Sequence, residues 1–277
     1  MTPEYKNRVS AYVIVYNEEK KITACLESLK NCVDEIIVIH DGLCDDATLD
    51  IAREYTDKVF VEKRLGVSDP HRVEAINRCQ YEWVLQLDAD ERLSPELKNN
   101  LPKIISNENA DAYSFNWVAE VGGRRTTFLR KQFLFRKKKM YLIALQHFQA
   151  ETYGILSHLN YDMLHDTSEF DSPFALLIRY IKKDYAWGVI TAKMISGDLS
   201  EIPVFNCSVT DSTPKQINKI KFMKKHPLVS MFIIPPYSFF NAYVLNRAYL
   251  HGWLGLVTSC HIPLHSFFAC FHLLRLK

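Results

Sequence analysis

The chain has 277 residues, a mass of 32.2 kDa and a formal net charge of +2, with 48% hydrophobic and 24% charged residues. This composition excludes a disordered or fibrous chain, and the small net charge excludes a general nucleic-acid binder. Beyond Asp211 there are eight Lys or Arg residues and no acid, whereas residues 1–211 carry 26 basic and 32 acidic residues. An acidic body with a basic, apolar tail predicts an anionic membrane surface as a partner.

Strands and helices are predicted to alternate through the first hundred residues. Apolar runs predict four strands, at residues 9–15, 35–39, 58–61 and 83–87. Helical spacing and helix-start signals predict four helices, at residues 20–30, 47–55, 70–78 and from 95 to about 106. Ser94 is the expected N-cap of the last helix, with Pro95 at its first position. This alternation predicts an α/β fold with a mostly parallel sheet and helices on both faces.

Polar clusters follow three of the predicted strands. They occupy residues 17–19 (Asn-Glu-Glu), 40–42 (His-Asp-Gly) and 88–91 (Asp-Ala-Asp-Glu). Ligands of open parallel sheets collect beyond the carboxyl ends of the strands. We therefore expect the active site at this edge of the sheet.

The second half of the chain changes character several times. Residues 111–165 are rich in aromatic and basic residues and are predicted to form mixed strands and loops. Residues 173–196 are predicted to form one long helix, and residues 197–226 an irregular polar segment. From residue 227 onward the chain becomes apolar.

Three motifs in this order resemble the family 2 glycosyltransferases of GT-A fold, in particular the bacterial lipopolysaccharide-core and cell-surface glycan transferases. Residues 14–19 (Ile-Val-Tyr-Asn-Glu-Glu) resemble the first strand and nucleotide-binding turn, and residues 38–42 (Val-Ile-His-Asp-Gly) the strand that ends in two acids and a Gly. Residues 85–93 (Leu-Gln-Leu-Asp-Ala-Asp-Glu-Arg-Leu) closely match the subgroup's Leu-Asp-Ala-Asp-Glu-Arg. The resemblance covers the first 170 residues well and the tail more loosely. It implies a Rossmann-like GT-A fold and sugar transfer from a nucleotide donor.

The resemblance also implies which residues bind the donor. Tyr16, Asn17 and Glu18 are expected to line the base and ribose pocket, and Asp41 to hydrogen-bond the uracil ring. The family's Asp before Asp41 is replaced by His40. The alternatives are that the acids only open the next helix and that Asp41 only forms a turn.

Two arginines match positive positions of the family. Arg72 precedes the fourth strand, where the family often places a cation facing the donor. Arg136 ends residues 133–136 (Phe-Leu-Phe-Arg), which resemble the subgroup's Leu-Phe-Arg and imply a phosphate or acceptor contact. The alternative for both is a solvated surface charge.

A divalent cation, Mg²⁺ or Mn²⁺, is implied by the same resemblance. Leaving-group charge on a nucleoside diphosphate is stabilised by a metal that acts as a Lewis acid, and hard oxygen ligands suit these ions. Asp90 is the expected ligand, Asp88 is expected to contact the ribose or the metal through water, and His165 to complete the metal shell or contact the diphosphate. Helix capping is the alternative for the Asp pair, but Ser94 already fills that role.

The catalytic base is less clearly marked. The subgroup commonly has a Val-His-Glu stretch, which residues 146–148 (Gln-His-Phe) match without the Glu. His147 and Glu120 are the candidate bases for removing the acceptor hydroxyl proton. Glu120 is preferred over Glu151 because it follows a predicted strand. Ordinary polar residues without a catalytic role are the alternative for both.

Eight basic residues and no acid lie between residues 124 and 139, interleaved with Phe128, Phe133 and Phe135. Because the rest of the body is acidic, a nucleic-acid surface is not favoured. A phosphorylated or lipid-linked acceptor or an anionic lipid is the preferred ligand for this stretch, and a solvated basic face is the alternative.

The apolar tail contains two interrupted segments. Pro235 and Pro236 are expected to split the first, so that neither half reaches the roughly 20 residues that span a membrane. In the second, His261, His265 and His272 share one helix face, which favours a helix lying in the membrane interface. The alternatives are a spanning or re-entrant helix, a core helix or oligomer interface, and a histidine metal site.

Cysteine usage bears on the compartment. The seven cysteines include no CxxC motif, and their odd number favours reduced thiols in the cytoplasm. The first apolar run, residues 9–16, is too short for a signal peptide. Together with the tail, these features predict a peripheral or monotopic protein at the cytoplasmic face of a bacterial inner membrane.

The predicted organisation is a GT-A domain at residues 1–170, a helical extension at 171–211 and a membrane-associating tail at 212–277. Residues 1–93 form its expected donor half and residues 94–170 its acceptor half. The predicted function is inverting, metal-assisted transfer of a sugar, from a UDP-sugar, to a lipid-linked or lipopolysaccharide-type glycan. A nucleotidyltransferase and a degenerate transferase serving as a membrane scaffold are the alternatives. The former is disfavoured because no Gly-rich basic loop follows the first strand.

Overall fold

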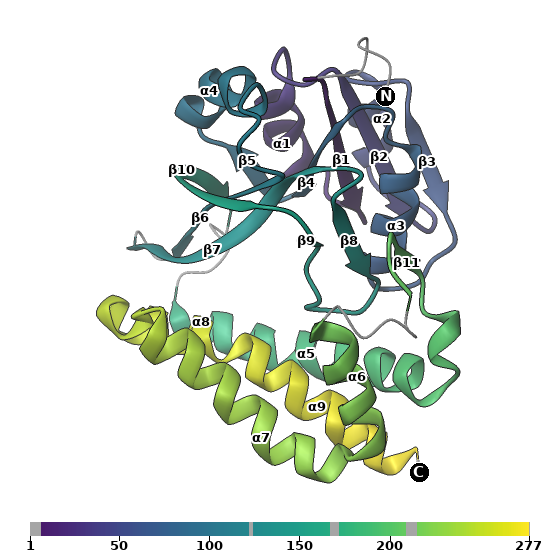
Figure 1. The fold of residues 1–277 in the computed structure, drawn as a ribbon, viewed down its shortest axis with the longest axis vertical. Coiled ribbons are helices and arrows are strands. Elements are labelled where there is room, and N and C mark those ends of the chain that lie inside the picture. The colour runs from purple at the N-terminus through teal and green to yellow at the C-terminus, as the bar shows by residue number, and fades with distance from the viewer. Residues whose placement is uncertain (1–6, 122–123, 167–171, 209–214, 277) are drawn as a thin grey trace.

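The computed structural model describes residues 7–121, 124–166, 172–208 and 215–276, and it shows an α/β body packed on a layer of C-terminal helices (Figure 1). The strands are β1 Val9–Val15, β2 Glu35–Asp41, β3 Val59–Glu62, β4 Trp83–Asp88, β5 Glu91–Leu93, β6 Ala112–Val121, β7 Arg124–Arg136, β8 Met140–Ile143, β9 Glu151–Thr152, β10 Leu156–His165 and β11 Val204–Phe205. The helices are α1 Ile22–Leu29, α2 Thr48–Arg53, α3 Asp69–Arg78, α4 Pro95–Ile105, α5 Pro173–Ser196, α6 Lys215–Lys225, α7 Pro227–Phe240, α8 Gly252–Ser259 and α9 His261–Arg275.

The main sheet has the strand order β3-β2-β1-β4-β7-β6-β10-β5. The first four strands are mutually parallel, β6 is parallel to β10, and β7 and β5 run antiparallel to their neighbours. A second sheet has the order β11-β8-β9. The α/β prediction is therefore confirmed, as a mixed sheet whose first half is wholly parallel.

Both faces of the sheet are covered, as the unbroken apolar sequence of β1 requires. Val13 and its neighbours on one face pack against α1 and α4 in one hydrophobic cluster. Tyr12 and Ile14, on the other face, pack against α3 and β8 in a second cluster. The Ser94 cap is confirmed, because its Oγ accepts a hydrogen bond from the Leu97 amide at 3.2 Å.

The predicted break at Pro235 and Pro236 is wrong. Helix α7 continues through both prolines and runs on as a π-helical turn, Asn241–Leu245. Proline's fixed φ is compatible with a helix, and each proline only removes an amide donor and strains the preceding turn. The predicted irregular segment at 197–226 is also partly wrong, because α6 forms within it.

The C-terminal helices share a core with the body. A third hydrophobic cluster joins Ile143 and Leu145, at the end of β8, to Ile195 of α5, Ile220 of α6 and Leu273 of α9. The sequence becomes basic and apolar near residue 212, but this change does not separate the core of the α/β body from that of the C-terminal helices.

The histidine face of α9 points inward, so the interpretation of these histidines as the polar face of a helix in the membrane interface is wrong. His265 lies within 3.0 Å of the Thr191 hydroxyl of α5 and is 3% exposed, and His272 is likewise buried. His261 reaches Asp184 of α5 at 2.8 Å. The polar stripe of α9 is surrounded by apolar side chains and packs on α5. The spacing of residues on α9 alone does not reveal this partner helix.

Candidate active site

The three sequence motifs meet at the carboxyl edge of the parallel strands, as expected. In the register of the sheet, Ile14 pairs with both Ile39 and Asp88, and Val15 pairs with His40. The residues that follow β1, β2 and β4 therefore lie side by side at one end of the sheet.

His40, the departure from the family pattern, joins the first two motifs. Its Nε2 accepts a hydrogen bond from the Asn17 amide at 3.2 Å, and its Nδ1 lies 2.9 Å from the Gly42 carbonyl oxygen. These partners require a neutral imidazole that carries its proton on Nδ1. Asn17 adopts a left-handed backbone with φ 50°, and the Glu18 amide donates to Thr48 Oγ1 at 2.7 Å. His40 thus holds the turn in place where the family uses an acid.

Asp41 is engaged within the protein. Its carboxylate accepts hydrogen bonds from the Leu65 and Gly66 amides at 2.6 and 2.9 Å, and it lies 2.7 Å from Arg64 Nη1 and 2.9 Å from His71 Nε2. Although burial raises the pKa of Asp41, these donors outweigh burial and lower it. In this structure Asp41 anchors the loop after β3.

A stacked pair flanks this loop. The Arg64 guanidinium lies 3.3 Å from the centroid of the Tyr16 ring, which is 40% exposed. An exposed aromatic ring at this edge offers a flat surface for a nucleobase. The Tyr16 ring is therefore exposed at the edge where the sequence predicts the nucleotide base.

Asp88 is held by two cations. Its Oδ1 lies 2.6 Å from Arg72 Nη2, and its Oδ2 lies 3.4 Å from Lys131 Nζ. Burial raises the pKa of Asp88, but Arg72 and Lys131, with a contribution from Lys183 of α5, hold it well below its usual range. Arg72 thus lies at the same edge as Asp88, and both carboxylate oxygens of Asp88 already face a cation.

Asp90 and His165 form the better ligand pair. His165 Nε2 lies 3.3 Å from Asp90 Oδ2, and the His165 ring stacks on Trp117 with centroids 4.3 Å apart. The buried Nδ1 of His165 has no hydrogen-bond partner among the described residues. Asp90 and His165 lie far apart in the sequence, and strand β10 brings them together.

Two members of this network were missed in the sequence. Glu91 is 1% exposed, and its carboxylate accepts hydrogen bonds from the Asp88 amide at 2.9 Å and from Trp117 Nε1 and Lys131 Nζ at 2.7 Å. Its place in the Asp-Ala-Asp-Glu motif was a signal. Lys131 was hidden within the basic stretch, which gave no sign that one of its lysines faces inward.

A further buried acid borders the site. Asp69, at the start of α3, is 4% exposed, and its Oδ2 has no hydrogen-bond partner among the described residues. Burial raises its pKa to about 6, against the opposing charge of Arg72. A carboxyl group of this kind is typical of functional sites, and nothing in the sequence of α3 singled it out.

The structure does not bring Arg136 to this edge. It pairs in register with Trp83, at the amino end of β4, and forms an ion pair with Glu82 there. Its Nε donates to the Ala110 carbonyl at 3.3 Å. The antiparallel course of β7 places Arg136 at the end of β4 opposite Asp88, so its position gives no support to the expected phosphate or acceptor contact.

The two candidate bases occupy different places. His147 lies in a buried cluster with Asp184 of α5 and His261 of α9. The side chain of Glu120 lies outside the part of the chain that the structure describes. Its backbone is in β6 directly after Ala119, which pairs in register with His165. The backbone of Glu120 is therefore one residue from the register partner of His165.

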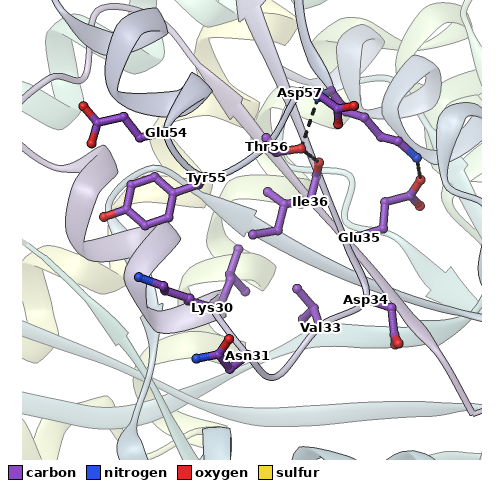
Figure 2. A pocket seen from close by; sticks show the side chains of 12 residues that line it. Lys30, Asn31, Val33, Asp34, Glu35, Ile36, Glu54, Tyr55, Thr56 and Asp57 are labelled. Atoms are coloured by element: carbon purple, nitrogen blue, oxygen red, sulfur yellow. Dashed lines mark hydrogen bonds and ion pairs between the residues drawn. The ribbon is translucent and has the colours of Figure 1, made fainter.

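A separate hollow of about 510 Å³ lies beside the end of α1 and the loop between α2 and β3 (Figure 2). Its lining includes the paired side chains of Lys58 and Glu35 and the Tyr55 ring. Because Glu35 begins β2, the hollow is at the amino edge of the sheet, opposite the motifs. We assign it no part in the chemistry.

Comparison with known proteins agrees with the motifs. The model of the family described as Glycosyl transferase family 2 matches residues 10–163. An uncharacterized glycosyltransferase of Rickettsia felis is 38% identical over 107 residues, which cover 38% of this chain and 37% of the relative. The lipopolysaccharide core biosynthesis glycosyltransferase LpsC of Rhizobium meliloti is 32% identical over 103 residues, which cover 35% of this chain and 37% of the relative. The matches thus span little more than a third of the length of these curated relatives.

Solved structures resemble the chain over a larger part of its length. The crystal structure of S. aureus TarS 1–349 in complex with UDP-GlcNAc has a TM-score of 0.48 and 16% identity, and covers 95% of this chain and 90% of that chain. Mannosyl-3-phosphoglycerate synthase from Rubrobacter xylanophilus has a TM-score of 0.47 and 14% identity, and covers 68% of this chain and 74% of that chain.

Proposed function

The chain belongs to glycosyltransferase family 2, and we propose that it transfers a sugar from a UDP-linked donor to a lipid-linked or lipopolysaccharide-type glycan, with inversion at the anomeric carbon. One observation carries this proposal. At the end of β4, Asp90 stands beside His165 while Arg72 and Lys131 hold Asp88, next to the turn that carries Tyr16. This edge combines a ligand pair for a cation with fixed positive charge for a diphosphate. LpsC, a relative named for lipopolysaccharide core biosynthesis, supports the acceptor class.

The residues at this edge fit a divalent cation. Asp90 Oδ2 and His165 Nε2 lie 3.3 Å apart, a spacing at which one ion contacts both. The other ring nitrogen of His165, Nδ1, has no hydrogen-bond partner among the described residues. Asp90 and His165 would hold Mg²⁺ or Mn²⁺, and Asp88, paired with two cations, would position Arg72 and Lys131 toward the diphosphate. The ion would supply Lewis-acid stabilisation of the leaving diphosphate. Tyr16, Asn17 and Glu18 form the base and ribose side, and Glu120 accepts the proton of the acceptor hydroxyl.

The donor assignment is tested by binding. Purified protein is titrated with UDP-, GDP-, CMP- and dTDP-linked sugars, with and without Mn²⁺, by isothermal calorimetry. We expect at least one UDP-sugar to bind in the presence of Mn²⁺ and to bind at least about tenfold more weakly without it, since a metal held by Asp90 and His165 would supply positive charge for the diphosphate. Binding of a non-uridine donor would contradict the UDP assignment. Binding of none would favour the degenerate scaffold.

The proposed place of action is the cytoplasmic face of the bacterial inner membrane, reached through α7. By length and composition, two helical stretches are apolar enough to cross a membrane, Pro227–Leu245 and Ala248–Arg275. The first is only 6% buried and the second 44%. Phe232 and Tyr237 of α7 are 67% and 66% exposed, whereas α9 packs on α5. The exposed apolar face of α7 lies on a helix that runs along the packed C-terminal layer. This arrangement supports a helix lying in the membrane interface over one that spans the membrane.

Membrane binding is expected to have a salt-sensitive and a salt-resistant part. Basic side chains near an anionic surface contribute about 1 kcal/mol each and are screened by salt, whereas inserted apolar surface is not. In vesicle flotation, 1 M salt should therefore loosen the protein from phosphatidylglycerol vesicles without releasing all of it, and detergent should release it fully. Phe232→Glu combined with Tyr237→Glu should remove the salt-resistant part.

Leu43→Glu is the matched control, because Leu43 is 83% exposed but belongs to the α/β body. It should float like the unmodified protein. A full-length protein that stays with the vesicle-free fraction at low salt would show instead that α7 covers another protein surface.

A further inference from the structure

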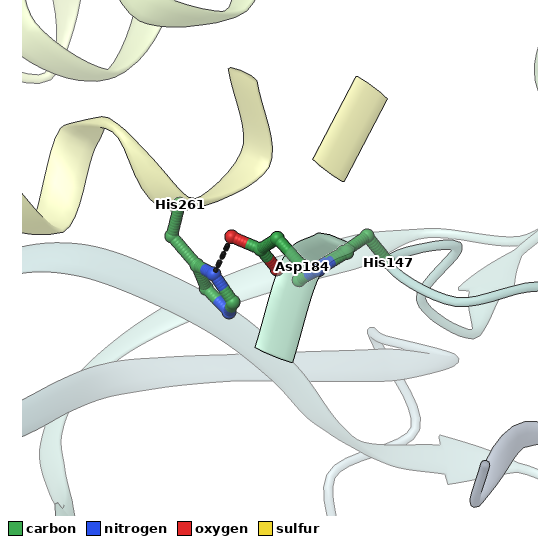
Figure 3. Close-up of side chains that lie close together, drawn as sticks. All are labelled: His147, Asp184 and His261. Carbon is green, nitrogen blue, oxygen red and sulfur yellow. Dashed lines mark hydrogen bonds and ion pairs between the residues drawn. The ribbon is translucent and has the colours of Figure 1, made fainter. Parts of the chain in front are cut away.

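Two imidazoles and a carboxylate gather where the α/β body meets the C-terminal helices. His147 belongs to the segment after β8, Asp184 to the middle of α5, and His261 to the first position of α9. Figure 3 shows the three side chains converging from these separate elements. The proposed sugar transfer uses none of them.

The spacing of the side chains is that of metal ligands. His147 Nε2 lies 3.5 Å from Asp184 Oδ1, and His261 Nδ1 lies 2.8 Å from Asp184 Oδ2. One ligand atom from each of the three residues lies within 4.8 Å of the others. Zinc bonds to nitrogen and oxygen are about 2.0–2.2 Å long, so that two ligands of a tetrahedral ion are about 3.4 Å apart. The His147–Asp184 separation matches that edge.

Two of these ligand atoms are buried without the hydrogen-bond partners that buried polar atoms normally have. His147 Nε2 and Asp184 Oδ1 are buried, and neither has a hydrogen-bond partner among the described residues. The Asp184 side chain is fully buried and the His147 side chain 15% exposed. Leaving a buried polar atom unpaired is costly, and the cost is greater for a carboxylate. A cation between the two atoms would satisfy both.

The backbone at His147 adopts an unusual conformation. His147 has a left-handed φ of 64°, a conformation that non-glycine residues hold mainly where surrounding structure imposes it. Asp184 supplies a carboxylate to the ligand set, and its Oδ2 already lies in hydrogen-bond contact with His261 Nδ1.

We infer that His147, Asp184 and His261 bind a Zn²⁺ ion, separate from the Mg²⁺ or Mn²⁺ that Asp90 and His165 would hold. Two imidazoles and one carboxylate are a typical zinc set, whereas Mg²⁺ prefers oxygen ligands and octahedral geometry. Water or His265, whose ring centroid lies 4.5 Å from that of His147, completes the tetrahedron. Thr191 stands behind His265 as a hydrogen-bond partner.

The ion would link three elements that are far apart in the sequence. It would join the segment after β8 to α5 and α9, and so fix the helical layer on the body at the point where their shared core lies. Helix α5 also carries Lys183, whose charge acts on Asp88 and Asp90. The zinc site is therefore structural, and its predicted effect is on stability more than on chemistry.

The test uses the full-length protein in detergent. It is stripped with a chelator, reconstituted with ZnCl₂ alone, desalted and analysed by mass spectrometry for metal, with thermal unfolding measured in parallel. We expect about one zinc per chain and a rise in melting temperature of roughly 5 °C or more on reconstitution, since the metal binds only the folded state. Co²⁺ in place of Zn²⁺ should give the visible absorption of a tetrahedral site.

Three variants locate the ion. His261→Ala should lose the zinc and its thermal shift, while His226→Ala, at an exposed histidine, should keep both. Asp90→Asn should also keep both, because Asp90 belongs to the other metal site. Unmodified protein that binds no zinc and no Co²⁺ would overturn the inference and leave a protonated His147 paired with Asp184. Zinc that is lost in Asp90→Asn and kept in His261→Ala would overturn it equally. The Co²⁺ spectrum of the unmodified protein decides the question even if a variant fails to fold.

Discussion

Asp90→Asn is expected to lower the rate of sugar transfer by at least about 10³-fold, or about 4 kcal/mol of transition-state stabilisation, while the protein keeps its fold. The amide is almost the same size as the carboxylate but lacks the charge that would hold a divalent cation beside His165. The rate is measured at saturating donor and saturating Mn²⁺, so that weak donor binding does not account for the loss. Melting temperature, measured alongside, should change little because Asp90 is 30% exposed.

The matched control is Asp50→Asn, at a surface aspartate that forms an ion pair with Arg53. Its transfer rate should equal that of the unmodified enzyme. Chelation should abolish transfer by the unmodified enzyme, and Mn²⁺ alone should restore it. Full activity of the purified Asp90→Asn enzyme would remove Asp90 from the proposed metal site.

Glu120→Gln is expected to lower turnover by about 10²–10⁴-fold with little change in donor affinity. The backbone of Glu120 follows Ala119, the register partner of His165, which places this residue at the edge where transfer is proposed. A glutamine keeps the size of the side chain and cannot accept the acceptor's proton. Turnover is compared with donor affinity from calorimetry, because loss of the base is expected to lower turnover and leave donor affinity nearly unchanged.

Glu96→Gln, an exposed substitution in the first turn of α4, provides the control and should behave like the unmodified enzyme. His147→Ala separates the two original candidates. If His147 is a zinc ligand and not the base, two results are expected for His147→Ala. Its melting temperature is lower than that of the unmodified protein, and its turnover, measured on folded protein without zinc, falls by less than tenfold. A Glu120→Gln enzyme slowed by less than tenfold would mean that the base lies elsewhere.

Several parts of the fold were predictable because they depend on local patterns. The apolar run of β1 is buried along its whole length and matches its predicted bounds. Ser94 and Pro95 begin a helix as their residue types dictate. Each of these features follows from hydrophobic period, capping or proline chemistry within a few neighbouring residues, and local free energies of this kind survive the tertiary context.

The donor side of the site was predictable for a related reason. Strand ends carry the motifs, and a parallel sheet brings its carboxyl ends together whatever the side-chain details are. Asp90 and Arg72 accordingly lie at the expected edge. The family resemblance added their roles, since residue type and spacing alone do not distinguish a ligand from a cap.

Other features depended on contacts that no local pattern encodes. Asp88 is neutralised by Arg72 from 16 residues away and by Lys131 from 43 residues away. His261 meets Asp184 across 77 residues, and the same packing turns the histidine face of α9 inward. Arg136 had a matching motif but lies at the end of β4 opposite Asp88. By itself the sequence determined the alternating elements and the motif-bearing edge, because hydrophobic period and strand direction are local properties. Only the tertiary structure decided which charges pair and which histidines meet, because those outcomes depend on register and helix packing between segments that the sequence keeps far apart.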